Sequence, residues 1–182
     1  MNLENQNLLV KPDQFDLIPI VSVHLIYKEQ FLIFERDDNK VGPVSGKIET
    51  GESYTDAAVR ETKEETLLEL NPSQVHDSGH FFFGISHREK NVFGKTLYAN
   101  LCSKTFEPSQ IRLNSELYDY EILSFEKAIR KISKYGHPES VDGIHCVLKQ
   151  LVNYSERLPL YNSRKIGGGI KLSSSGMLSG RN

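Results

Sequence analysis

The sequence predicts one α/β domain, and three observations support this. The chain has 182 residues, a length typical of a single domain. Apolar runs rich in β-branched and aromatic residues predict strands at 18–27, 31–34, 81–83, 91–102 and 118–123. Good helix formers, or apolar residues at helical spacing, predict helices at 53–65, 125–134 and 140–154. We therefore expect the folded domain to span residues 17–156.

The composition limits the possible partners. The chain has 22 Lys and Arg against 24 Asp and Glu, so its net charge is −2 and any phosphate binding must be local. The longest apolar run, 17–27, is too short to cross a bilayer, and the first residues do not resemble a secretory leader. Cys102 and Cys146 are far apart, which favours free thiols. We expect a cytoplasmic protein without a membrane partner.

The two ends of the chain differ from the middle. Residues 1–16 are polar and are predicted to form a short arm. Residues 157–182 contain runs of glycine and serine, five basic residues and no acidic side chain. This composition favours a disordered, solvated tail, although a basic arm that contacts nucleic acid is the alternative.

One predicted helix carries a cluster of acidic residues. Glu61, Glu64 and Glu65 stand at positions i, i+3 and i+4, so their side chains leave one face of the helix. Three carboxylates on one face suit Mg²⁺ or Mn²⁺, which prefer oxygen ligands. The glycines of the preceding loop, Gly46 and Gly51, allow its backbone to approach the helix and to add a carbonyl ligand. For the glutamates alone, a solvated helix surface is the commoner explanation.

The spacing of these residues resembles the signature of the Nudix hydrolases, G-x5-E-x7-R-E-U-x-E-E-x-G-U, in which U is a bulky apolar residue. The matching positions are Gly46, Glu52, Arg60, Glu61, Glu64, Glu65 and Leu68. A chance match of the fixed letters has a probability on the order of 10⁻⁵. The resemblance extends over residues 17–154 and implies a Nudix-type α/β/α sandwich around a mixed β-sheet.

Two positions depart from this signature. Thr62 replaces the usual apolar residue, and Leu67 replaces the glycine that normally ends the helix in a left-handed conformation. Leucine in that conformation costs about 1–2 kcal/mol. We therefore predict that the helix continues for about a turn through residues 68–70 and ends at Asn71, before Pro72.

The resemblance implies a Mg²⁺-dependent pyrophosphohydrolase that directs water to a phosphorus of a nucleoside diphosphate derivative. A nucleoside triphosphate, an oxidised nucleotide and a nucleotide sugar are the expected substrates. The alternatives are removal of pyrophosphate or a cap from RNA 5′ ends, which the basic tail weakly favours, and a non-catalytic nucleotide-binding module. The catalytic set carried over from the family is Arg60, Glu61, Glu64, Glu65 and Glu116. Glu116 is the candidate general base, although it could be an ordinary exposed turn glutamate.

Roles within this set also follow from the resemblance. Glu61, Glu64 and Glu65 are the expected metal ligands, with the carbonyl near Gly46, and Glu52 supports them together with Arg60.

Residues outside the signature are expected to select the substrate. Arg36, His87, Arg88 and Lys90 are candidates to face phosphates, although surface positions explain them as well. Tyr98, like Phe81 and Phe83, could stack on a base, although strand aromatics more often pack in a core. The sequence does not indicate an oligomeric state.

Overall fold

The computed structural model describes residues 17–85, 90–101 and 106–157, and side chains up to residue 152. The strands are β1 (Ile18–Tyr27), β2 (Gln30–Arg36), β3 (Val41–Gly42), β4 (Val44–Lys47), β5 (Val75–Ile85), β6 (Asn91–Asn100) and β7 (Leu117–Leu123). The helices are α1 (Tyr54–Thr66), α2 (Phe125–Tyr135) and α3 (Pro138–Arg157), with short 3₁₀ turns at Pro72–Gln74 and Pro108–Gln110. No described helix combines the length and the apolarity needed to cross a lipid bilayer.

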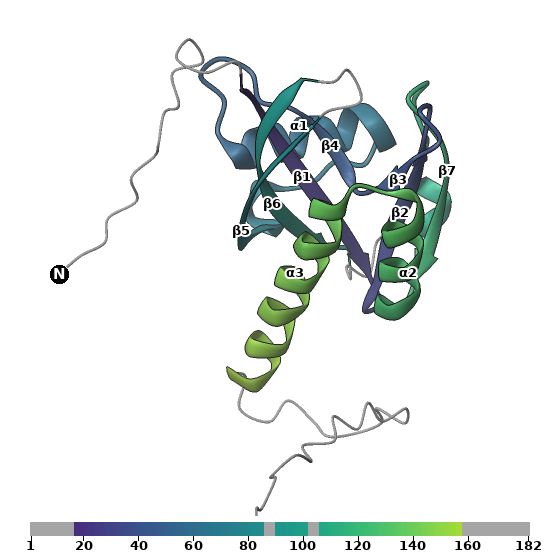
Figure 1. The fold of residues 1–182 in the computed structure, drawn as a ribbon. Coiled ribbons are helices and arrows are strands. Elements are labelled where there is room, and N and C mark those ends of the chain that lie inside the picture. Colours follow the sequence, from purple (N-terminus) through teal and green to yellow (C-terminus); the bar gives the residue numbers. More distant parts are fainter. Residues whose placement is uncertain (1–16, 86–89, 102–105, 158–182) are drawn as a thin grey trace, which may run out of the picture.

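The strands form one mixed sheet (Figure 1). Its order is β3-β2-β1-β6-β5, with β4 beside β1 and β7 beside β2. The long β1 and β6 run parallel, in a register from Ile18 opposite Val92 to Ile26 opposite Asn100. The pairings of β1 with β2 and β4, and of β5 with β6, are antiparallel. The predicted hairpin of β1 and β2 and the predicted mixed sheet are confirmed.

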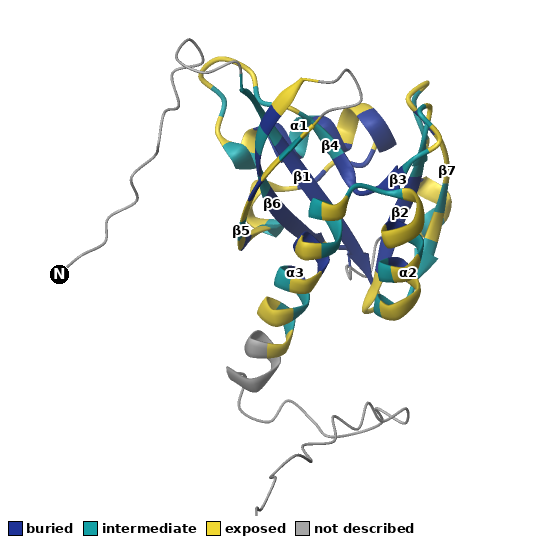
Figure 2. Cartoon of the chain, viewed as in Figure 1, coloured by how far each residue is buried: buried dark blue, intermediate teal, exposed yellow. Residues whose placement is uncertain are grey.

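The helices cover both faces of the sheet. Successive side chains of a strand point to opposite faces, so each strand contributes apolar residues to the packing on both sides. Residues such as Val21 and Val23 of β1 pack with Ala57 and Ala58 of α1. On the other face, Ile26 packs with residues of α2 and α3, namely Ala128, Ile132, Ile144 and Val147. Figure 2 shows the sheet strands buried between the helices, as the predicted α/β/α sandwich requires.

Helix α1 begins as the sequence predicts. The Ser53 hydroxyl accepts a hydrogen bond from the backbone N–H of Asp56, and the Asp56 carboxylate accepts one from the N–H of Ser53. This reciprocal pair satisfies two of the amides that a helix start leaves without partners. These two hydrogen bonds therefore fix the position of the first turn of the acidic helix.

The predicted end of this helix is wrong. Helix α1 stops at Thr66, and Leu67 adopts the left-handed conformation with φ of 56°. Leaving the helix there buries Leu68 and Leu70, which are 8% and 7% exposed in the core, whereas Leu67 points out and is 62% exposed. Burying a leucine side chain contributes about 1.5–3 kcal/mol, so two of them outweigh the strain at one residue.

Backbone contacts from a later segment also fix this helix end. The carbonyl of Thr66 accepts a hydrogen bond from the N–H of Arg112, and the carbonyl of Glu65 accepts one from the N–H of Asn114. These bonds satisfy carbonyls that a helix terminus otherwise leaves unpaired. The chain before β7 is thereby joined to the C-terminal end of the acidic helix.

Candidate active site

A cavity of about 500 Å³ lies on the side of the sheet that faces α3. Its floor includes the alternate β1 residues Ile18, Ile20 and Ser22. Strands β4 and β5 stand on opposite sides of the β1–β6 pair, roughly 14 Å apart at the usual strand spacing. The side near β4 is lined by Arg36, Gly46, Glu61, Glu64 and Glu116, and the side near β5 by Phe82, Val92, Glu139 and Ser140.

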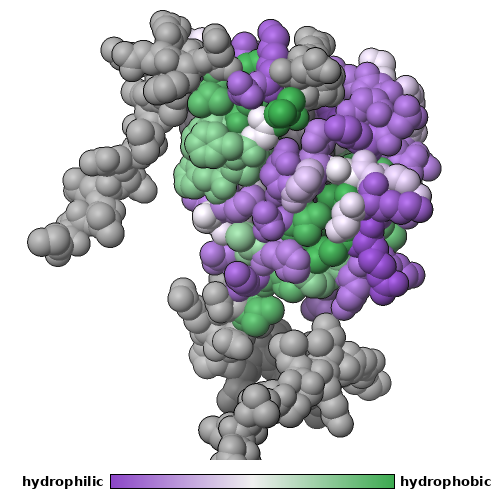
Figure 3. All heavy atoms as spheres, in the orientation of Figure 1, coloured by the Kyte–Doolittle hydropathy of each residue, from purple (hydrophilic) through white to green (hydrophobic). Residues whose placement is uncertain are grey.

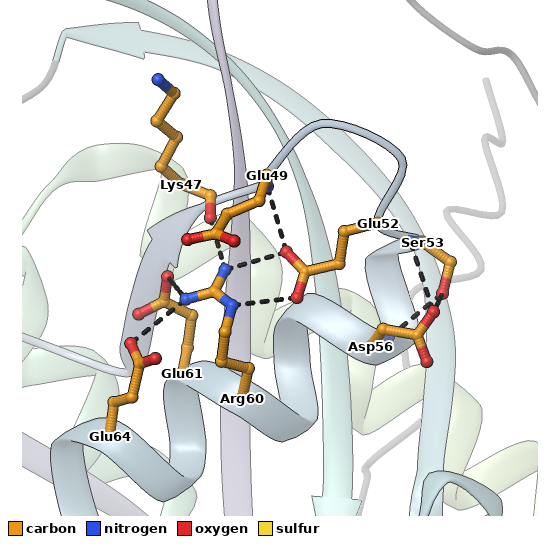
Figure 4. Close-up of polar contacts among 8 residues, drawn as sticks. All are labelled: Lys47, Glu49, Glu52, Ser53, Asp56, Arg60, Glu61 and Glu64. Atoms are coloured by element: carbon orange, nitrogen blue, oxygen red, sulfur yellow. Dashed lines mark hydrogen bonds and ion pairs between the residues drawn. The ribbon is translucent and has the colours of Figure 1, made fainter.

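Arg60 connects the loop after β4 to the acidic face of α1 (Figure 4). Its guanidinium donates to both carboxylate oxygens of Glu52, each at 2.9 Å, and to the carbonyl oxygen of Lys47 at 2.7 Å. It also donates to Glu61 at 2.7 Å and to Glu64 at 3.1 Å. One arginine therefore sets the positions of three carboxylates, two of which line the cavity.

Gly46 makes room for one of these carboxylates. A Cβ built at Gly46 would overlap the carboxyl group of Glu61. Glycine is thus the residue that allows β4 to lie against α1 while Glu61 keeps its position. The backbone carbonyl of the next residue, Lys47, accepts a hydrogen bond from Arg60 beside the same acidic cluster.

Glu65 is the most buried member of the trio. Its side chain is 2% exposed, and neither carboxylate oxygen has a hydrogen-bond partner of normal geometry, although the nearby backbone of Ser45 favours the charged form. The nearest cation is Arg36, whose Nη1 lies 3.5 Å from Glu65 Oε1. Burial raises the pKa of Glu65 to about 8, and Arg36 counteracts part of this rise. A buried carboxylate without hydrogen bonds is costly unless a cation neutralises it.

Two carboxylates that accept hydrogen bonds from Arg60 respond differently. Burial raises the pKa of Glu61, although the hydrogen bond from Arg60 lowers it in part. The hydrogen bonds that Arg60 donates hold the pKa of Glu52 below its ordinary value. Glu52 is therefore the fixed anionic partner of Arg60, whereas Glu61 and Glu65 lack full charge compensation.

Arg36 lies between the helix and the segment that precedes β7. Besides Glu65, it reaches Glu116, with 4.0 Å between Nη2 and Glu116 Oε2, and it donates to the Ser45 hydroxyl at 3.4 Å. Glu116 is 59% exposed and lines the cavity. The fold thus brings Arg36 and Glu116, which are 80 positions apart, to the acidic face of α1.

In this structure the three clustered acidic side chains of α1 form ion pairs with Arg36 and Arg60. Among the residues that the structure describes, no three carboxylate, imidazole or thiolate groups stand ready around a single point at metal-binding distance. Glu61 and Glu64 share Arg60, while Glu65 faces Arg36.

The remaining sequence candidates fall in different places. Lys90 lines the cavity. Tyr98 packs in the core cluster between the sheet and α3 and does not line the cavity. His87 and Arg88 lie outside the described residues.

The aromatic residues of β5 divide between the two faces of the strand. Phe82, and not its neighbours, lines the cavity. Phe81 and Phe83 are 52% and 70% exposed on the opposite face of the strand, where Phe81 stacks on Phe93 and Phe83 packs against it at a tilt. Figure 3 shows an apolar surface over the β5–β6 region.

Sequence reasoning missed the wall of the cavity that α3 and β5 supply. It includes Phe82, His137, Glu139 and Ser140. One signal was available, because polar residues beside Pro138 mark the first turn of a helix. Which side of the sheet that turn would reach depends on the tertiary fold.

The family model of the NUDIX domain matches residues 17–142. The chain belongs to the Nudix family. This Nudix membership identifies the protein as a hydrolase that acts on pyrophosphate bonds, and enzymes of the family in general use divalent metal ions. A comparison with curated proteins finds no match.

Solved structures share the Nudix fold at low sequence identity. The structure of a Caenorhabditis elegans Ap4A hydrolase binary complex matches with a TM-score of 0.58 and 19% identity, over 75% of this chain and 99% of that one. The Escherichia coli dihydroneopterin triphosphate pyrophosphohydrolase matches with a TM-score of 0.60 and 19% identity, over 74% and 95%. A MutT protein from Methanosarcina mazei gives 0.56 and 19%, also over 74% and 95%. At this identity the likeness shows the fold alone.

Proposed function

We propose that this Nudix hydrolase cleaves the diphosphate linkage of a small nucleoside diphosphate derivative, with Mg²⁺ or Mn²⁺ held by Glu61, Glu64 and Glu65. A nucleoside triphosphate, an oxidised nucleotide or a nucleotide sugar fits a cavity of about 500 Å³, which is within the usual range for small ligands. The single observation that carries the proposal is the buried carboxylate of Glu65. It lies beside two further carboxylates, and its oxygens have no hydrogen-bond partner of normal geometry.

The residues present fit a divalent cation. Oxygen donors are the ligands that Mg²⁺ and Mn²⁺ prefer, and the carbonyl near Gly46 adds one to the three carboxylates. When bound, the metal would neutralise the diphosphate charge and lower the pKa of a water molecule. Binding requires Glu61 and Glu64 to exchange a hydrogen bond from Arg60 for the metal, while Glu52 keeps Arg60 in place.

Other residues of the chain would bind the phosphate and accept the proton of the attacking water. Arg36 lies at the cavity wall, where its guanidinium can hold a phosphate oxygen through two donors. Glu116 is exposed to the same cavity and is our candidate for the general base that removes a proton from the attacking water. Gly46 keeps the space that the Glu61 carboxylate needs.

A turnover assay tests this proposal. The purified protein is incubated with nucleoside triphosphates, an oxidised guanine nucleotide, nucleotide sugars and 5′-triphosphorylated RNA, with Mg²⁺ and with excess chelator, and the phosphate products are identified. We expect metal-dependent release of a nucleoside monophosphate from at least one small nucleotide. Tight nucleotide binding without turnover would instead indicate a binding module, and turnover of the RNA alone would indicate an RNA 5′-end enzyme.

A further inference from the structure

A second carboxylate site lies across the cavity from the acidic helix. Glu139, in the first turn of α3, lines the cavity and lies against Gly84 of β5. A Cβ built at Gly84 would stand 2.5 Å from Glu139 Oε1, so a larger residue there would displace the carboxylate. The 19% exposure of the Glu139 side chain places it at the cavity wall and not on the open surface.

The same strand also supplies an aromatic wall. Phe82 is two residues from Gly84 on β5, and its ring lies over Gly94 of β6, where a Cβ would overlap it. Phe82 is 8% exposed and lines the cavity with Ile20 and Val92. Two glycines on neighbouring strands therefore make room for a flat apolar surface beside a carboxylate.

Among residues 17–85, 90–101 and 106–152, no lysine or arginine forms an ion pair with Glu139. Within the described part of the chain, its one recorded ion-pair contact is His137 Nδ1 at 3.8 Å, which is too long for a hydrogen bond. Burial, followed by the neighbouring Lys40, lowers the pKa of His137, so this imidazole is neutral at pH 7. Lys40 itself lies 3.3 Å from the other ring nitrogen of His137.

An ionised carboxylate accepts hydrogen bonds and donates none. It is matched by a ligand edge with two adjacent donors, as the Arg–carboxylate pair illustrates. Among the common nucleobases, guanine has such an edge, formed by its ring N1–H and its 2-amino group. Adenine and cytosine place a ring acceptor beside their amino group, and this acceptor would face a carboxylate oxygen.

We propose that Glu139 and Phe82 form a base subsite that selects guanine-type bases, with the diphosphate directed toward Glu61 and Glu64. This inference rests on the proposed function, because the pyrophosphohydrolase site supplies the other half of the cavity. Glu139 accepts the two donors of the base edge, and Phe82, Ile20 and Val92 contact its faces. Loss of a hydrogen bond in such a site leaves a half-buried polar group unpaired, which makes the discrimination steep.

Wild-type kinetics give the first test. We expect kcat/KM for dGTP to exceed that for dATP by at least about tenfold, and inosine triphosphate, which lacks the 2-amino group, to fall between them. Equal kcat/KM for dGTP, dATP and inosine triphosphate would overturn the base subsite while leaving the pyrophosphohydrolase in place.

Three variants give the second test. In Glu139→Gln the amide offers one acceptor and one donor, which matches the edge of adenine, so the dGTP-to-dATP ratio should fall at least about tenfold. Glu139→Ala should abolish the preference without creating a new one. Glu126→Gln, an exposed first-turn glutamate of α2 outside the cavity, is the matched control and should retain the wild-type ratio. A Glu139→Gln variant with the wild-type ratio would overturn the proposal.

Binding of nucleoside monophosphates separates this inference from the proposed function. GMP and AMP contain no diphosphate to cleave, so their dissociation constants, measured by calorimetry, report the base subsite alone. Tighter binding of GMP that Glu139→Ala removes supports the subsite even if no nucleotide is hydrolysed, in which case the proposed function is wrong. Equal binding of GMP and AMP contradicts the subsite regardless of turnover.

Discussion

The carboxyl group of Glu61 lies against the α-carbon of Gly46. This contact joins the acidic face of α1 to strand β4. It is possible only because residue 46 has no side chain. Because Arg60 holds the same carboxylate from the other direction at 2.7 Å, Glu61 is fixed between a backbone and a guanidinium.

Replacement of Gly46 by alanine should remove activity without unfolding the protein. The added methyl group would overlap the Glu61 carboxyl group, which must rotate away from its position in the cavity wall. We expect kcat/KM to fall at least about 100-fold, as displacing an essential catalytic group commonly does. Circular dichroism should remain that of the wild type. Activity within about threefold of the wild type would show that the position of Glu61 is not needed.

The charge of the acidic face should be essential. Glu64→Gln and Glu65→Gln keep the side-chain shape and remove one potential metal ligand each, so we expect kcat to fall more than about tenfold. Titration with Mn²⁺, followed by calorimetry, should show weaker metal binding in both variants. Glu69→Gln, which alters an exposed glutamate just beyond the helix, is the control and should bind Mn²⁺ as the wild type does. Retained activity in both active-face variants would contradict the metal role.

The Arg60–Glu52 pair should contribute to both stability and turnover. Glu52→Gln removes the charge that faces two guanidinium donors at 2.9 Å, and both side chains are largely shielded from solvent. We expect a loss of about 1–2 kcal/mol in the free energy of unfolding, measured with urea. Turnover should also fall, because Arg60 then positions Glu61 and Glu64 less firmly. The exposed Lys63–Glu69 pair provides the comparison, since Glu69→Gln should not shift the unfolding midpoint.

Mild acid should destabilise the protein through His24. This histidine is fully buried, neither ring nitrogen has a hydrogen-bond partner, and burial lowers its pKa to about 3. In the unfolded chain His24 binds a proton below about pH 6.5, whereas in the folded chain it binds one only below about pH 3. The free energy of unfolding therefore falls as the pH decreases through this window. Between pH 7 and pH 5 this amounts to about 2 kcal/mol.

A variant isolates this contribution. His24→Leu cannot take up the proton, so its free energy of unfolding should decrease less between pH 7 and pH 5 than that of the wild type. His145→Gln changes an exposed histidine of α3 and serves as the control. Parallel pH profiles for the wild type and His24→Leu would contradict the assignment.

The left-handed residue after α1 should tolerate glycine well. Leu67 is 62% exposed with φ of 56°, so Leu67→Gly removes strain and little packing. We expect a gain of about 1 kcal/mol in urea unfolding, which is the strain released less the entropy of a glycine in the unfolded chain. Leu68→Ala, one residue later, should instead lose about 2 kcal/mol or more because that side chain is buried. A destabilised Leu67→Gly would show that the helix end is not strained.

Local patterns were sufficient for the longer elements and for part of the candidate site. Glu61, Glu64 and Glu65 share one helix, so spacing alone predicts their common face. The hairpin of β1 and β2 follows from two apolar runs separated by a short polar turn. These features depend on neighbours in the chain, which the sequence displays directly.

Other features depend on distant segments. The end of α1 at Thr66 follows from the burial of Leu68 and Leu70, and tertiary packing outweighs the local conformational preference of Leu67. Strand β5 is longer than predicted because its first residues pair with β6 across an irregularity between Asp77 and His80, which interrupts the alternation. The place of Glu139 against Gly84 required the two elements to be packed together.

Strand β1 separates two tasks along a single stretch of backbone. Its odd-numbered side chains from Val21 to Leu25 support the helix that carries the acidic residues, while Ile18, Ile20 and Ser22 form part of the opposite floor. Mutations at Ile18, Ile20 and Ser22 are therefore expected to change recognition while the packing beneath the acidic helix is preserved. Such a partition lets selectivity drift over evolutionary time without a compensating change in the hydrolytic machinery.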